Sequence, residues 1–309
     1  LDVRTLVGYA SHPNVLNEAG AETADMLIAV TQSDEINMIA CQVAQALFSV
    51  PIKIARVRSE VYNSGENSSL FDTGSIQIDA IISPEQEVAQ SFTRLVAVPG
   101  AKDLISFDND LVRLIQITLG EDCPVLNTPL TQLTELFPDL GARVVYIVRN
   151  EEGIVPNKLS QMKSGDNIYI IAESDKTDRV LSVFGKETAH ARRIVIIGGG
   201  RTALNVARSI EINEPQSKVT LIENNKNRAE ILANKLEKSV VLFGDALDKE
   251  VLEEANIQEA DFAFAVTGND EVNILSSILA KKYGCHSSAV LLAEDKYNPL
   301  ISSLDIDAV

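Results

Sequence analysis

A short apolar run that ends in a glycine-rich turn constrains the fold of this chain most. Ile194–Ile197 is typical of a buried strand, and a helix-compatible run, Thr202–Glu211, follows directly. Between them lies the pattern Gly-x-Gly-x-x-Ala, which allows a tight turn and a close approach of backbone to a diphosphate. The free N–H groups at the start of the helix favour phosphate. The candidate ligand-binding residues of this turn are Gly198, Gly199, Gly200, Arg201 and Thr202.

Two later apolar runs strengthen this prediction. Val219–Ile222 ends at Glu223, about 25 residues after the first glycine, near the spacing at which a carboxylate binds both ribose hydroxyls. Val240–Phe243 ends at Gly244, followed by Asp245. Because Glu223 would repel a 2′-phosphate, NAD is favoured over NADP. The same groups would hold the ribose and phosphates of ATP or ADP, and a βαβαβ unit without any ligand is the plain alternative.

Composition excludes several classes of function. A length of 309 residues favours two or three domains, and no apolar run reaches the roughly 18 residues that span a bilayer. The net charge of −17 argues against binding to nucleic acid or to anionic lipid. Three cysteines lie far apart in the sequence, which indicates reduced thiols in a cytosolic protein.

The chain also contains an internal repeat. Leu6–Ala10 matches Leu242–Ala246, and Ala24–Asn37 matches Ala260–Asn273, with a constant offset of 236 residues. A register held without gaps indicates a duplication. The first copy lacks the equivalent of residues 193–236, so we expect the chain to be a fragment of a longer tandem protein.

Polar residues follow one apolar strand in each copy. In a parallel sheet such strand ends face the ligand crevice, which makes Thr31, Gln32, Thr267 and Gly268 candidate ligand-binding residues. Capping of the following helix is the alternative role of the two threonines.

The region between the copies has a different sequence pattern. Ser83-Pro84-Glu85-Gln86 is a capping box that begins a helix to about Leu95, as a linker or as a helix that crosses to a partner subunit. Short runs follow, separated by turns at residues 151–153 and 164–166. We therefore predict an α/β protein: Rossmann-like parallel-sheet nucleotide-binding domains at residues 1–90, where only the C-terminal part is present, and 190–309, with a small α+β domain at 91–189 between them.

The sequence offers no candidate catalytic or metal-binding constellation. There is no P-loop and no Tyr followed four residues later by Lys, and none of the three histidines has an evident carboxylate partner. Binding without turnover is the simplest interpretation. An NAD-dependent oxidoreductase is the alternative, and hydride transfer would distinguish the two.

The glycine turn with Glu223, the Gly-Asp-Ala at 244–246, the repeated Ala-Val-Thr…Asp-Glu-x-Asn and the Ile-Ser-Pro-Glu of 82–85 resemble RCK (regulator of K+ conductance) proteins. The tandem arrangement is similar to the regulatory subunits of Trk-type potassium uptake systems. This resemblance implies a cytosolic protein, peripheral on the inner face of the inner membrane. It implies a homo-oligomeric ring that gates a TrkH-like potassium channel subunit by binding NAD(H) or ATP/ADP. An RCK regulator of another cation system remains open.

The resemblance also assigns ligand-binding roles to individual residues. It places nucleotide on Gly198–Thr202, Glu223, Asp245, Thr267 and Gly268 in the second copy, and on Thr31, Gln32 and Arg56, as a phosphate-binding arginine, in the first. Two departures matter. Tyr9 replaces the Asp of Gly-Asp-Ala in the first copy, and Leu292 is expected opposite Arg56, so that the second crevice lacks this cation.

Overall fold

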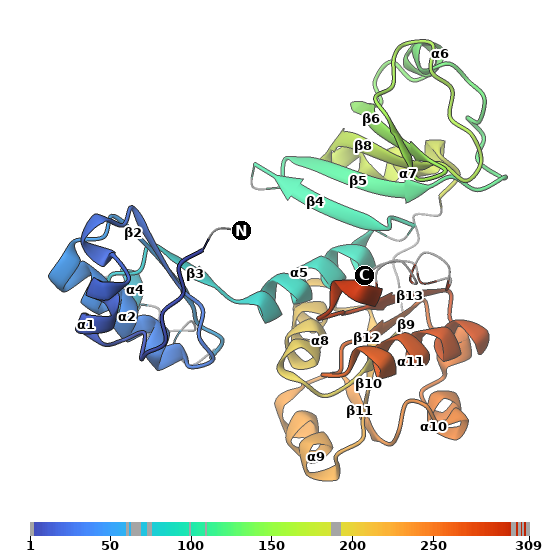
Figure 1. The fold of residues 1–309 in the computed structure, drawn as a ribbon. Coiled ribbons are helices and arrows are strands. Elements are labelled where there is room, and N and C mark those ends of the chain that lie inside the picture. The colour runs from blue at the N-terminus through green and yellow to red at the C-terminus, as the bar shows by residue number, and fades with distance from the viewer. Residues whose placement is uncertain are drawn as a thin grey trace. The chain divides into compact units, whose positions relative to one another are not determined.

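The computed structural model describes residues 3–59, 62, 69–72, 76–98, 100–108, 110–186, 193–297, 301, 304 and 306. The chain divides into two compact units, Leu1–Glu87 and Val88–Val309. The predicted boundary at residue 90 therefore falls inside the second unit. Among the described residues the first unit contains one parallel sheet, and the second contains one parallel and one antiparallel sheet (Figure 1).

The first unit is a small α/β layer built on three parallel strands in the order β1-β2-β3. Helix α2 packs on β1 and β2, because its apolar residues recur at helical spacing, and Ser33 caps it by accepting the N–H of Ile36. The described elements are α1 (Pro13–Glu18), β1 (Met26–Ala29), α2 (Asp34–Phe48), β2 (Ile52–Arg56), α4 (Ser69–Asp72) and β3 (Ala80–Ile82).

Strand β1 exposes one apolar face. Met26 and Ile28 are 45% and 55% exposed, whereas their counterparts in the second copy, Phe262 and Phe264, are buried. The repeat therefore reproduces the strand but not its surroundings. In the second copy the same strand position is flanked on both sides by paired strands.

The second copy forms a five-stranded parallel sheet in the order β11-β10-β9-β12-β13. Two separate apolar cores lie on it, since side chains alternate between its faces. Ile194 and Ile196 enter one core, while Val195 and Ile197 enter the other. The elements are β9 (Arg193–Ile197), α8 (Arg201–Asn213), β10 (Lys218–Glu223), α9 (Lys226–Lys235), β11 (Val240–Phe243), α10 (Lys249–Glu254), β12 (Phe262–Ala265), α11 (Asp270–Lys282) and β13 (Ser287–Val290).

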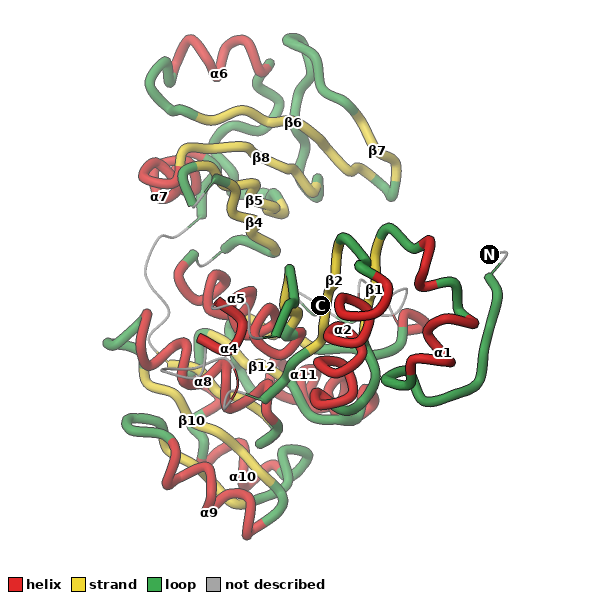
Figure 2. Tube along the Cα trace, turned by 90° about the vertical axis from the view of Figure 1, so that its left-hand side faces the viewer, coloured by secondary structure: helices red, strands yellow, loops and turns green. Residues whose placement is uncertain are grey.

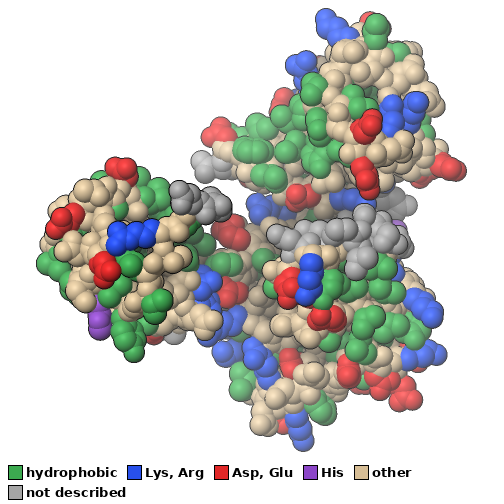
Figure 3. All heavy atoms as spheres, in the orientation of Figure 1, with side chains coloured by type: hydrophobic (Ala, Val, Ile, Leu, Met, Phe, Trp, Pro, Cys, Tyr) green, Lys and Arg blue, Asp and Glu red, His purple; other side chains and the backbone are tan. Residues whose placement is uncertain are grey.

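An antiparallel sheet in the order β4-β5-β8-β6-β7 lies between the copies in sequence (Figure 2). Its elements are β4 (Asp103–Phe107), β5 (Val112–Thr118), α6 (Leu130–Leu136), β6 (Ala142–Arg149), β7 (Glu152–Ile154), β8 (Asn167–Glu173) and α7 (Thr177–Val183). One face packs with both helices in an apolar core. The other leaves Ile105, Phe107 and Ile171 exposed, and hydrophobic side chains gather over β4 and β5 in Figure 3.

The predicted position of the turn at residues 151–153 is partly wrong. Glu152 and Gly153 belong to strand β7, and the turn is the preceding pair, Asn150 and Glu151, both with positive φ. A two-residue hairpin turn needs this backbone, and asparagine tolerates it. The turn predicted at 164–166 is present, with Gly165 at φ +85°.

Helix α5 (Pro84–Ala97) begins at Pro84, as predicted, and forms part of the core of the second unit. The predicted capping box is not formed, because the Ser83 hydroxyl has no hydrogen-bond partner among the described residues. Ala89, Phe92, Leu95 and Val96 are buried against residues of β9, α8 and β12. The Thr93 hydroxyl donates to Ala89 O at 2.8 Å and is 2.9 Å from Ser209 Oγ of α8. Beyond Glu87, α5 is thus packed along its length and is not a free linker.

Candidate functional site

The glycine turn after β9 is shaped by contact with the end of β12. Gly198 has φ +106°, a conformation that favours glycine, and its N–H donates to Ile222 O at 2.9 Å. A Cβ at this position would lie 2.9 Å from Thr267 Cγ2 and 3.1 Å from Thr267 Cα. The structure therefore brings two predicted ligand-binding residues, Gly198 and Thr267, into contact.

Helix α8 begins directly at this turn and has no side-chain cap. Gly200 is its N-cap residue, and no side-chain hydrogen bond caps this helix among the described residues. A Cβ at Gly200 would meet only Val266 O at 3.8 Å and Thr202 N at 4.0 Å, which are ordinary van der Waals distances. Arg201 and Thr202 are the first residues of the helix, exposed and half-buried respectively. The geometry suits an anion, because unsatisfied N–H groups and the positive end of the helix dipole meet there.

Glu223 ends β10 directly beside the glycine turn. The residue is only 7% exposed, and Oε1 accepts the N–H of Asn225 at 2.7 Å. Any side chain at Gly199 would overlap the Glu223 carboxylate and Leu232 Cδ1. Glycine at 199 thus leaves room for the acid beside the turn, and the predicted ribose acid and phosphate turn are adjacent.

The remaining predicted residues of the second copy lie at its rim. Asp245 is exposed, and Oδ1 accepts the N–H of Leu247 at 2.9 Å, which holds the carboxylate against its own turn. Gly268 is exposed, with no atom within 4 Å of an added Cβ. Since the strand order is β11-β10-β9-β12, Asp245 and Gly268 flank the glycine turn on opposite sides.

Both copies carry the same buried hydrogen-bond network behind the strand end. Asn273 is fully buried; its Oδ1 accepts the Thr267 N–H at 2.8 Å, and its Nδ2 donates to Leu291 O at 2.8 Å. Asn37 does the same with the Thr31 N–H at 2.8 Å and with Arg56 O at 2.9 Å. The threonines are therefore fixed rather than free. Sequence reasoning quoted these asparagines as a motif but assigned them no role.

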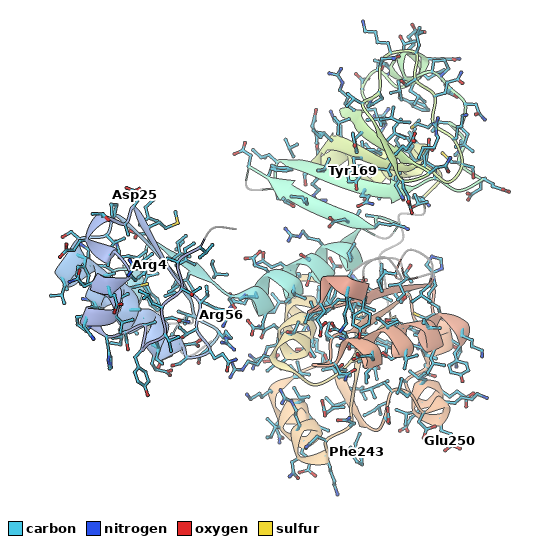
Figure 4. The ribbon with its side chains drawn as sticks, in the orientation of Figure 1. Arg4, Asp25, Arg56, Tyr169, Phe243 and Glu250 are labelled. Atoms are coloured by element: carbon cyan, nitrogen blue, oxygen red, sulfur yellow. The ribbon has the colours of Figure 1, made fainter. Side chains whose placement is uncertain are left out.

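Two arginines lie at the strand ends of the first copy. Arg56, at the carboxyl end of β2 (Figure 4), donates from Nη2 to Val30 O at 2.8 Å and to Thr31 O at 2.7 Å. Arg58 donates from Nη2 to the same Thr31 oxygen at 3.3 Å. Both Nε atoms are buried and have no hydrogen-bond partner among the described residues. Gln32, next to Thr31, is exposed. Sequence reasoning missed Arg58, although it lies two residues from Arg56 on the same extended segment.

The expected equivalence of Arg56 and Leu292 is wrong by one residue. Ala29 pairs with Ala55, whereas its counterpart Ala265 pairs with Val290, so the offset falls to 235 at the second strand. The segment from helix to strand is one residue shorter in the second copy. Leu291 is therefore the counterpart of Arg56, and Ala293 that of Arg58. The crevices still differ in charge, with two arginines in the first copy and two apolar residues in the second.

In each copy a tyrosine in the loop after the second strand contacts the helix that precedes this strand, α2 or α11. Tyr297 Oη donates to Glu271 Oε1, and Tyr62 Oη lies 3.4 Å from Glu35 Oε1. The tyrosine hydrogen bond lowers the pKa of Glu271, and the same bond raises the pKa of Tyr297. The repeat thus extends to the rim of each crevice.

The described part of the chain offers no metal centre and no membrane span. No group of three or more His, Cys, Asp or Glu side chains that could hold a metal ion occurs among those residues. None of the helices described there is both long and apolar enough to cross a bilayer.

Sequence comparison shows the family of this chain. The TrkA-N domain family matches residues 1–84 and 194–309, and the TrkA-C domain family matches residues 114–185. The Trk system potassium uptake protein TrkA of Azorhizobium caulinodans is 45% identical over 308 residues, which cover 100% of this chain and 67% of that protein. The protein of the same name from Vibrio alginolyticus is 40% identical, over 99% of this chain and 66% of that one. The chain thus spans about two thirds of these relatives.

Comparison of structures gives the same fold. The GsuK RCK domain has a TM-score of 0.70 at 17% identity and covers 98% of this chain and 63% of that one. The GsuK channel bound to NAD has a TM-score of 0.69 at 16% identity, covering 98% and 52%. At such low identity this likeness concerns the fold alone. Both domain families and the match to TrkA proteins along the whole of this chain establish that the chain belongs to the TrkA family.

Proposed function

We propose that this chain is part of a nucleotide-binding regulatory subunit of a Trk-type potassium uptake system. The observation that carries the proposal is the meeting of the glycine turn, Glu223 and Thr267 at one end of a parallel sheet. Crevices at such strand ends, where the strand order reverses, bind nucleotides in doubly wound folds. The names of its relatives support the assignment to potassium uptake.

The second crevice is proposed to bind NAD(H), with ADP or ATP as possible ligands of the same groups. Gly198–Thr202 would receive the phosphates, Glu223 the ribose hydroxyls, and Asp245, Thr267 and Gly268 would line the rim. The buried carboxylate of Glu223 disfavours a 2′-phosphate through charge repulsion.

The first crevice is proposed to favour ligands with more phosphate charge. Arg56 and Arg58 converge there on the carbonyl oxygen of Thr31, and Arg58 also pairs with Asp34 at 4.0 Å, while the counterparts of both arginines in the second copy are apolar. Guanidinium groups bind phosphate through charge-assisted, often bidentate, hydrogen bonds. Arg56, Arg58, Thr31 and Gln32 are therefore proposed to bind the phosphates of ATP or ADP.

We assign residues 1–90 to part of a first nucleotide-binding domain, 91–189 to a small α+β domain and 190–309 to a second nucleotide-binding domain. By family analogy the subunit forms a homo-oligomeric ring on the inner face of the inner membrane and gates a TrkH-like channel. A ligand shifts such a gate only if it binds its two states with different affinity. The subunit is proposed to bind nucleotide without turning it over.

Calorimetric titration of NADH, NAD, ADP and ATP into the chain tests the proposal. Saturable binding of NADH is expected, and Glu223→Gln, which removes the charge but keeps the shape, should weaken it about ten-fold or more, since one charged hydrogen bond contributes roughly 1.5–3 kcal/mol. Glu250→Gln is the matched control, because Glu250 is exposed on α10 away from the glycine turn (Figure 4). No binding of any of the four, or equal weakening by both substitutions, would refute the proposed site. Hydride transfer from bound NADH would refute the proposal that the subunit binds nucleotide without turning it over.

A further inference from the structure

Arg228, on the neighbouring helix α9, forms a hydrogen bond to the glycine turn. It lies in the first turn of α9, and its Nε donates to the carbonyl oxygen of Gly199. Its backbone N–H donates to Oδ1 of Asn225, the N-cap residue of α9, at 3.1 Å. Asn225 in turn donates its N–H to Glu223 Oε1 at 2.7 Å. One continuous set of hydrogen bonds therefore joins Glu223, the start of α9 and the middle of the glycine turn.

The rest of the Arg228 guanidinium is available to a ligand. A guanidinium carries five N–H donors, and in the described residues only Nε of this one has an acceptor. The side chain is exposed and forms no ion pair with a described carboxylate. Glu223, a charged residue of the same predicted site, already accepts a hydrogen bond from the backbone N–H of Asn225.

The position of this cation indicates which ligand atom it serves. Gly199 lies between Gly198, which contacts Thr267, and Gly200, the N-cap residue of α8. A phosphate at the start of α8 would thus lie next to the Gly199 carbonyl oxygen, to which Arg228 already donates a hydrogen bond. The Nε hydrogen bond holds the guanidinium in place before the ligand arrives, which reduces the entropy lost on binding.

We propose that Arg228 is a ligand-binding residue of the second crevice, and that it contacts the diphosphate group of the bound nucleotide. The inference rests on the proposed nucleotide-binding function and adds a residue and a chemical class to that site. The guanidinium supplies the positive charge that the apolar Leu291 and Ala293 do not. Glu223 and Arg228 divide the ligand between them: the acid binds the ribose hydroxyls and the arginine binds the phosphate.

Titration of ADP, NADH, NADPH and adenosine into the full chain tests this assignment. Arg228→Met should weaken ADP and NADH about ten-fold, the loss expected for one charge-assisted hydrogen bond, and leave adenosine unchanged because adenosine has no phosphate. Arg228→Lys keeps the charge without the planar fork and should recover part of the ADP affinity. Lys226→Met is the matched control, since Lys226 is an exposed cation at the start of the same helix. Because the first crevice can also bind ADP, each titration is repeated with Arg56→Met and Arg58→Met in place.

The outcomes separate this inference from the proposed function. An equal loss of ADP and adenosine affinity in Arg228→Met would show that the residue only positions the turn, and would overturn the assignment. Unchanged ADP affinity in Arg228→Met would also overturn the assignment. A wild-type preference for NADPH that Arg228→Met abolishes would overturn it too, since the arginine would then bind a 2′-phosphate. Absence of any nucleotide binding by the wild type would instead overturn the proposed function itself. Circular dichroism melts of each variant confirm that the fold is retained.

Discussion

Phe92 of helix α5 and Phe264 of strand β12 stack face to face, with ring centroids 4.6 Å apart and planes inclined by 1°. Phe264 also lies 5.4 Å from the ring of Phe262 on the same strand. Phe264 precedes Thr267 by three residues, so the stack anchors α5 to the strand that ends beside the glycine turn. The helix is therefore part of the core that supports the site.

Truncation of this stack should destabilise the second unit. We expect Phe92→Ala to lower the free energy of unfolding by about 3–5 kcal/mol, because a fully buried aromatic side chain leaves a cavity. Chemical denaturation followed by circular dichroism measures the change. Ile212→Ala is the control, because Ile212 is 77% exposed and its truncation should cost little. A loss no greater than that of the control would contradict the role of α5 as a core helix.

The buried asparagine of the second crevice should matter for both stability and binding. Asn273→Ala leaves the Thr267 N–H and the Leu291 carbonyl without partners in a buried setting, which costs about 1–3 kcal/mol for each group. It also frees Thr267, so NADH affinity should fall in parallel. Asn234→Ala, at an exposed position on α9, provides the comparison. If NADH affinity stays constant while stability falls, Thr267 does not contact the ligand.

The charge difference between the crevices predicts a difference in ligand preference. Combining Arg56→Met with Arg58→Met should weaken ATP binding more than NADH binding, because the arginines are proposed to bind the phosphates of ATP in the first crevice. We expect at least a ten-fold loss for ATP at low salt, where charge–phosphate interactions are least screened. Arg4→Met, an exposed cation of the same unit, should have little effect. Equal losses for both ligands would argue against separate specificities.

The antiparallel domain should become less stable in acid because of one buried carboxylate. Burial raises the pKa of Asp166, but hydrogen bonds from the Arg149 guanidinium at 2.7 Å and the Lys163 N–H at 2.8 Å outweigh it and hold the pKa below its ordinary value. Because the folded-state pKa is the lower one, this stabilisation is present above the unfolded pKa of about 3.9 and disappears as the pH falls through the folded value.

Replacement of the Asp166 carboxylate should therefore make the free energy of unfolding depend less on pH in the acid range. Asp166→Asn is expected to cost roughly 3 kcal/mol at neutral pH, since it leaves the partly buried Arg149 without its counter-ion. Below about pH 4 the difference from wild type should shrink. Thermal melts at a series of pH values measure it, with Glu135→Gln, an exposed acid of α6, as the control. A pH-independent difference would assign the effect to packing alone.

Local pattern predicted much of the fold of this chain. The glycine turn, the strand ends at Glu223 and Thr267 and the start of α5 at Pro84 are encoded by neighbouring residues, because turns, helix starts and buried strands impose backbone and side-chain requirements over a few positions. The two Thr–Asn networks were not predicted, although both lie within the repeated motif. Strands β3 and β7 were missed, since each has only three residues and no distinctive pattern.

The tertiary structure decided which of these residues meet. The constant offset of 236 predicted Leu292 opposite Arg56, but strand pairing shifts the register by one residue and places Leu291 there. Contacts between distant segments, such as Arg228 with Gly199 and Phe92 with Phe264, depend on strand order and helix packing, which no local pattern encodes. The sequence by itself determined the glycine turn, the acid at the end of β10 and the duplication. Only the packed sheet determined how they combine into crevices of different charge, because hydrogen-bond partners and close contacts are set by residues far apart along the chain.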